Sequence, residues 1–130
     1  MSNNTVCMLC LIGALSLSTS ACSMMQRTPM PTLAITASNH CADPAGVAMR
    51  GNAVTIALGS RPTTGYGVDL VNQAGRVTDM VLTFQEKKPA PNTMQGQMMT
   101  SPCLQIMLPT EWQKLTVIDQ ESQQHWHFSR

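Results

Sequence analysis

The stretch VTDMVLTFQ, residues 77–85, decides the fold class of this chain. Its large apolar side chains, Met80, Leu82 and Phe84, occupy every second position, and strongly β-forming residues stand between them. Successive side chains of a strand point to opposite faces, so this spacing gathers the apolar row on one face. The stretch therefore predicts a β-strand with one face in a core.

Similar runs lie on both sides of this stretch. Apolar residues alternate at 53–58 and 66–71 before it and at 104–108 after it. The shorter expected strands are 33–35, 97–99, 115–118 and 125–128. Turn-forming residues separate the runs, with a hairpin loop expected at 72–76. The pattern predicts an all-β fold, a small antiparallel β-sandwich or open barrel of about seven short strands after an N-terminal signal helix.

The N-terminal region has the features of a signal peptide. Residues 6–17, VCMLCLIGALSL, form an apolar run that is too short to span a bilayer but typical of a signal-peptide core. The small residues 18–21 follow, and then comes Cys22. This arrangement resembles the bacterial lipobox, which implies a lipoprotein signal peptide at 1–21 and lipidation of Cys22. Signal cleavage without lipid and an N-terminal core helix are the alternatives.

The remaining chain divides into a tether and a domain. Residues 22–31 contain two prolines and no apolar period, so they are expected to be a flexible tether. Residues 32–130 suit a single β domain. With 12% charged and 43% hydrophobic residues, the composition favours a compact domain over a disordered one. The net charge is +1 and the sequence has no basic run, so its charge pattern does not predict binding to nucleic acid.

The cysteines agree with export. Cys7 and Cys10 would leave with the signal peptide, and Cys22 would carry lipid. Cys41 and Cys103 remain, and in an oxidising compartment they are the expected disulfide pair. Two buried free thiols become the better interpretation if the protein stays in the cytosol.

The stretch GSRPTTGYGVDL, residues 59–70, is the most informative one for function. Pro62 presets a turn, the two threonines after it can bond to the loop backbone, and Gly65 permits a conformation closed to other residues. Tyr66 then begins a strand with a large amphipathic ring. A loop built in this way can hold a fixed shape at the end of a sandwich.

This loop and a later segment resemble the C-terminal domain of the protease complex subunit PrcB family, which occurs in bacterial lipoproteins. The first part of the resemblance is Gly59, Arg61, Pro62, Thr63, Gly65 and Tyr66. The second part is Pro89, Pro91, Gln97, Thr100, Pro102 and the apolar strand 104–108. The resemblance covers about residues 53–110. It implies a role in a surface protease complex.

The loop is also similar to the Asn-Pro-Thr-Thr-Gly-Tyr loop of chagasin-like protease inhibitors, with Arg61 in the place of asparagine. Both resemblances imply a protein partner, with a protease as the expected one. The predicted partner-binding residues are Arg61, Pro62, Thr63, Thr64, Gly65 and Tyr66. Arg61 and Tyr66 are expected to make most of the contact, so Arg61→Ala should weaken partner capture and leave the Tm nearly unchanged. A rigid structural hairpin without a partner is the alternative.

Metal chemistry has two weaker signals. His125 and His127 share one side of a strand, but no third ligand is identifiable. Among eleven methionines, Met94, Met98 and Met99 cluster, and soft thioethers can hold Cu(I). Methionine more often fills irregular gaps in a core, and this is the interpretation we prefer here.

The sequence thus predicts a secreted lipoprotein that binds protein and is not an enzyme. No catalytic constellation emerges, and we expect no cofactor, no metal and no small-molecule substrate. Ser23, rather than Asp, follows the expected lipidated cysteine. By resemblance to enterobacterial lipoprotein sorting, this residue implies the outer membrane, facing the periplasm. A structural envelope lipoprotein without a protease partner, or a metal-handling lipoprotein, is the alternative function.

Overall fold

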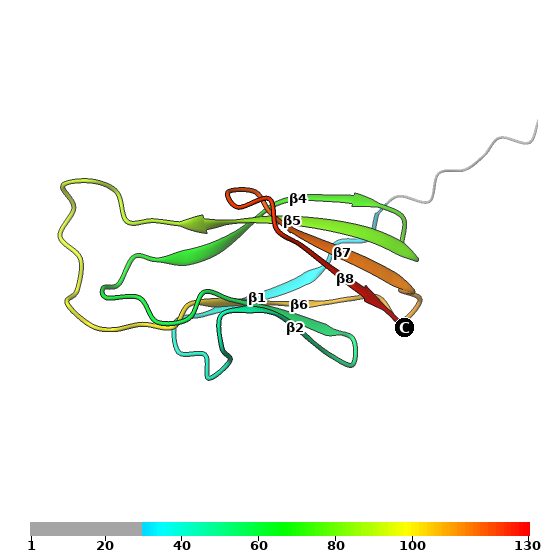
Figure 1. The fold of residues 1–130 in the computed structure, drawn as a ribbon, viewed down its shortest axis with the longest axis horizontal. Helices are drawn as coiled ribbons and strands as arrows, with labels where there is room; N and C mark the ends of the chain where they lie inside the picture. The colour runs from blue at the N-terminus through cyan, green and yellow to red at the C-terminus, as the bar shows by residue number, and fades with distance from the viewer. Residues whose placement is uncertain (1–29) are drawn as a thin grey trace, which may run out of the picture.

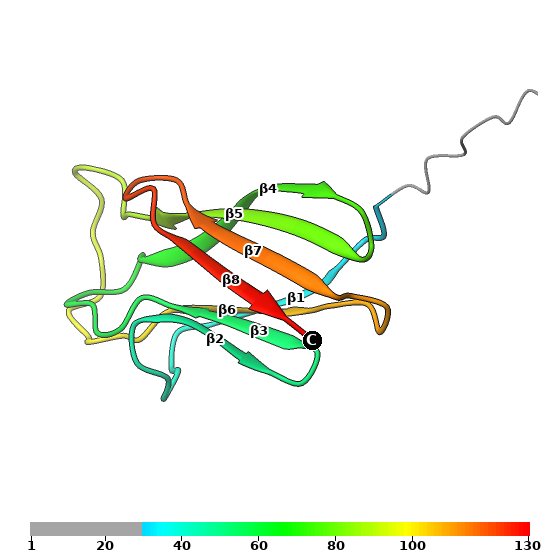
Figure 2. The same cartoon turned by 45° about the vertical axis from the view of Figure 1, so that its right-hand side comes forward.

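The computed structural model describes residues 30–130, whose strands form two four-stranded sheets. The first sheet has the order β1-β6-β3-β2 and contains β1 (Ala34–Ser38), β2 (Gly46–Arg50), β3 (Ala53–Ala57) and β6 (Cys103–Met107). The second has the order β4-β5-β7-β8 and contains β4 (Gly67–Gly75), β5 (Asp79–Lys87), β7 (Lys114–Asp119) and β8 (His125–Ser129). The sheets face each other as two layers (Figures 1 and 2). The predicted all-β fold is confirmed, and it is a sandwich.

The core lies between the two layers and is built from alternating residues. In β5, Met80, Leu82 and Phe84 are each no more than 5% exposed, as their spacing predicts. The buried residues that share their cluster in the other central strands are Val54, Ile56, Leu104, Ile106, Leu115 and Val117. Full burial of such a side chain contributes roughly 1.5–3 kcal/mol, so these strands hold the layers together.

One strand pair differs from the expected antiparallel arrangement. Strand β7 pairs with β5 in parallel, from Asp79↔Lys114 to Phe84↔Asp119, whereas the other strand pairs are antiparallel. A parallel pair needs a long crossover connection. Here β6 supplies it, because the chain leaves β5, passes through the opposite sheet and returns to β7 (Figure 1).

Two further expectations about strands are wrong. Residues 72–75, expected in a hairpin loop, extend β4, and the turn follows at 76–78, where Arg76 and Asp79 exchange backbone hydrogen bonds of 2.9 and 3.1 Å. A β-bulge between Leu70 and Asn72 lets β4 continue in register with β5. Residues 97–99, expected as a strand, are irregular because their segment leaves the sheets between β5 and β6.

Strand β2 is the element that the sequence analysis missed. It forms a hairpin with β3 across Gly51, whose φ is +60°, and Asn52. Val47 and Met49 pack against the core from this strand. The signal was the Gly-Asn dipeptide between two alternating apolar runs, which is typical of a tight hairpin.

The predicted signal peptide and its helix, the lipid site at Cys22 and most of the tether fall at positions 1–29, outside the described residues. Over residues 30–130, no helix has the length and apolar character needed to cross a membrane.

Candidate functional site

The two parts of the motif in the sequence meet at one end of the sandwich. Residues 58–66 connect β3 to β4, and residues 88–102 connect β5 to β6, so both segments cross between the layers at the same end (Figure 1). We call these two segments the paired loops. Arg61 and Thr100 join them as an antiparallel bridge, with backbone N–H to O distances of 2.7 and 2.9 Å.

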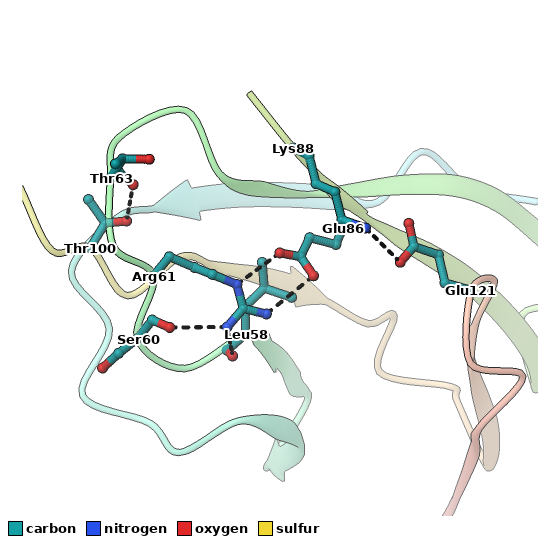
Figure 3. Close-up of polar contacts among 8 residues, drawn as sticks. All are labelled: Leu58, Ser60, Arg61, Thr63, Glu86, Lys88, Thr100 and Glu121. Carbon is teal, nitrogen blue, oxygen red and sulfur yellow. Dashed lines mark hydrogen bonds and ion pairs between the residues drawn. The ribbon is translucent and has the colours of Figure 1, made fainter. Parts of the chain in front are cut away.

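Further hydrogen bonds hold the paired loops together. The Thr64 backbone N–H donates to the Gly96 carbonyl at 3.0 Å, and the Gly96 N–H donates to the Thr64 hydroxyl at 2.8 Å. The hydroxyl of buried Thr100 donates to the Thr63 carbonyl at 3.1 Å (Figure 3). Because each segment satisfies polar groups of the other, the paired loops form one unit.

Gly65 allows the paired loops to approach this closely. Its φ of +94° lies in a region that other residues rarely adopt. A Cβ at this position would overlap the Gln95 side-chain amide and would lie 3.0 Å from the Cβ of Pro89. Glycine is therefore required both by the backbone conformation and by the packing.

Arg61 is anchored at the base of the paired loops. Its Nε and Nη2 donate to the two carboxylate oxygens of Glu86 at 2.8 and 3.2 Å, in a bidentate ion pair (Figure 3). Its Nη1 donates to the carbonyl oxygens of Leu58 and Ser60 at 3.0 and 3.1 Å. The hydrogen bond to Glu86 is the main cause that raises the pKa of Arg61 above its ordinary value, while partial burial opposes the rise. Arg61 thereby ties the loop to β5.

This arrangement changes the role expected for Arg61. The Arg61 side chain is 26% exposed, and its guanidinium already makes four hydrogen bonds. The Cζ atom of Arg61 lies 6.0 Å from the centre of the half-buried Tyr66 ring. Removing it would leave the half-buried Glu86 carboxylate without its partner. The expectation that Arg61→Ala leaves the Tm nearly unchanged is therefore incompatible with the structure.

Glu86 is the site residue that the sequence analysis missed. It follows Met80, Leu82 and Phe84 at the same two-residue spacing, so it continues the inward row of β5. A carboxylate on an apolar row signals a cation nearby, because an unpaired buried charge is costly. That signal was present, but it does not identify the cation.

The outer part of the paired loops is exposed and uncharged. Met94, Met98 and Met99 are 101%, 60% and 70% exposed. Residues 89–102 contain no charged side chain. The expectation that these methionines fill the core is wrong, because Pro89 and Pro91 interrupt the strand and the segment runs outside both sheets.

The structure also pairs the two cysteines expected to form a disulfide. Cys41 and Cys103 are bonded, and their Cα atoms are 6.1 Å apart, a usual separation for this bond. The bridge ties the segment after β1 to the first residue of β6. The Cys41 N–H also donates to the Ser101 carbonyl at 3.0 Å, so the backbone supports the same connection.

The histidine pair lies on β8, on the outer face. The ring centres of His125 and His127 are 6.2 Å apart, and His127 Nδ1 lies 3.2 Å from the Thr116 hydroxyl. Within residues 30–130, no group of three or more His, Cys, Asp or Glu side chains is placed to hold a metal ion. His40 lies elsewhere, in an isolated β-bridge with Ser101 outside the strands of both sheets.

These features define a class: a small β-sandwich with two hydrogen-bonded loops presented at one end. Residues 53–109 match the family model described as PrcB C-terminal. The match runs from the start of β3 to Pro109 and contains both paired loops. The predicted resemblance over residues 53–110 is confirmed, while the likeness to chagasin-like inhibitors stays a prediction. No curated protein and no solved structure matched the chain.

Proposed function

We propose that this chain is a lipid-anchored envelope protein whose β domain binds a protein of a protease complex through the paired loops. The observation that carries the proposal is the PrcB C-terminal match, whose two motif parts fold into one hydrogen-bonded surface. The proposal gives the domain a binding role rather than a catalytic one. It keeps the predicted contact at residues 61–66 and extends it to residues 88–102.

The paired loops have physical properties that suit binding. Their hydrogen bonds and Gly65 hold one shape before any partner arrives, which reduces the ordering cost of association. The exposed thioether side chains of Met94, Met98 and Met99 can adapt to an apolar surface. Because residues 89–102 are uncharged, the affinity of a partner for this outer part of the paired loops is expected to be insensitive to salt concentration.

Crosslinking in living cells tests the protein partner. A photo-reactive residue at position 94 is expected to capture a protease or a protease precursor, because Met94 is the most exposed large apolar side chain in residues 30–130. Mass spectrometry of the product identifies the partner. The same residue at position 111, between β6 and β7 at the opposite end of the sandwich, is the control. No product at position 94, or the same products at 94 and 111, would contradict the proposal and favour a structural envelope lipoprotein.

Fractionation tests the lipid anchor. Cys22→Ala is expected to release the protein from the membrane pellet and to remove the acyl mass, since two acyl chains anchor a protein firmly. Ser23→Ala, which keeps the acceptor thiol, serves as the control and is expected to stay in the pellet. Retention of Cys22→Ala in the membrane with unchanged mass would refute lipidation. We place the anchored protein in the outer membrane, facing the periplasm, on the basis of Ser23.

A further inference from the structure

A groove opens between the two layers beside the paired loops. Its volume is about 340 Å³, and its lining comes from the ends of β3, β5 and β7, the beginnings of β2 and β8, and nearby loop residues. Leu58, Phe84 and Trp126 provide the apolar part. We propose that this groove binds an arginine side chain of a partner polypeptide.

Aromatic rings form one part of the groove. The ring centres of Phe84 and Trp126 are 5.9 Å apart. Phe84 is buried, whereas Trp126 is only partly buried on the edge strand β8. A partly exposed indole is the best aromatic partner for a cation, and the flat guanidinium group can stack on it.

The polar part of the groove is negatively charged. Three carboxylates line it, those of Glu86, Asp119 and Glu121, against a single cation, Arg61. Lys88 at the rim approaches Glu121 at 3.5 Å, but both of these side chains are at least half exposed (Figure 3). The groove thus keeps an excess of negative charge that complements a cation.

The carboxylates of the groove differ in the hydrogen bonds that they already accept. Glu86 accepts from Arg61 with both oxygens. Asp119 accepts from the Glu121 backbone N–H at 2.9 Å and from the Ser122 hydroxyl at 2.8 Å, so its own turn holds it in place. Both bonds come from neutral donors, and an ionised carboxylate has further lone pairs. Asp119 and Glu121 are therefore the acceptors that a guanidinium would use.

The size and the position of the groove favour a side chain of a polypeptide. Its volume lies at the lower end of the roughly 300–1,000 Å³ typical of small-ligand sites, which suits one long side chain. Leu58 and Arg61 belong to both the groove and the paired loops, so one polypeptide can contact both. The inference goes beyond the proposed function because it holds whichever protein docks on the loops.

Two small probes of matched size test the arginine site. N-acetyl-arginine amide is expected to shift the indole N–H resonance of Trp126 in the natively processed protein, and the shift should saturate as the probe concentration rises. Trp112 is the internal control, because its indole N–H is buried and donates to Asn52 at 3.1 Å. N-acetyl-citrulline amide has nearly the same shape without the charge and is expected to bind at least about tenfold more weakly.

Variants separate the charge from the shape. Glu121→Gln is expected to lower the affinity for N-acetyl-arginine amide by about threefold, because an exposed ion pair contributes roughly this much to binding. Glu111→Gln, an equivalent change at the opposite end of the sandwich, should leave its affinity unchanged. Equal binding of the arginine and citrulline probes, or no saturable shift at Trp126, would overturn the proposal. Either result would leave the crosslinking test at position 94 unaffected.

Discussion

Loss of the Cys41–Cys103 bridge is expected to lower the free energy of unfolding by about 4 kcal/mol. The two cysteines are 62 residues apart in sequence, so the bond closes a long loop and restricts the unfolded chain. Chemical unfolding of the oxidised and the reduced protein measures the difference. Mass spectrometry of the unreduced protein should detect no free thiol at either cysteine.

A double variant provides the control for this prediction. Cys41→Ser with Cys103→Ala should be as stable as the reduced wild-type protein, because both lack the same covalent link. Alanine is chosen for position 103 since Cys103 is only 5% exposed and a hydroxyl there would be buried. Two free thiols in protein from an oxidising compartment, or equal stability of the oxidised and reduced forms, would refute the prediction.

Gly65→Val is expected to cost about 3 kcal/mol of stability and to separate the paired loops. A β-branched residue is strained at a φ of +94°, which costs roughly 1–3 kcal/mol. Its side chain must also displace Gln95 and Pro89, and such overpacking adds roughly 1–3 kcal/mol. For a domain of this size, we expect the Tm to fall by more than ~10 °C in a thermal unfolding scan.

Gly51→Val is the matched control for Gly65→Val. Gly51 also has a positive φ, +60°, but a Cβ there would meet no atom within 4 Å. The control therefore retains the backbone strain and lacks the steric overlap. Gly65→Ala introduces the same overlap with a single Cβ atom. Adding Gln95→Ala to this variant should restore about 1 kcal/mol of its free energy of unfolding, because the second change removes the amide that the new Cβ overlaps. If Gly65→Val costs no more than Gly51→Val, the paired loops are not packed as described.

The sequence by itself determined the features that depend on local spacing. The alternation of Met80, Leu82 and Phe84 correctly identified a strand and its buried face, because side-chain direction in a strand follows a period of two. The motif at residues 59–66 with its second part at 89–108 correctly predicted the resemblance to the PrcB C-terminal family, whose model matches residues 53–109. Turn chemistry and apolar periodicity are local, so no knowledge of the layers was needed.

The tertiary structure alone decided which distant residues meet. Glu86 lies 25 positions after Arg61, and only the crossing of both connections at one end of the sandwich joins them. The parallel pairing of β5 with β7 follows from the passage of β6 through the other sheet. The exposure of Met94, Met98 and Met99 depends on where residues 88–102 leave the layers. Local patterns do not encode these outcomes, because each depends on the packing of segments that are far apart in the chain.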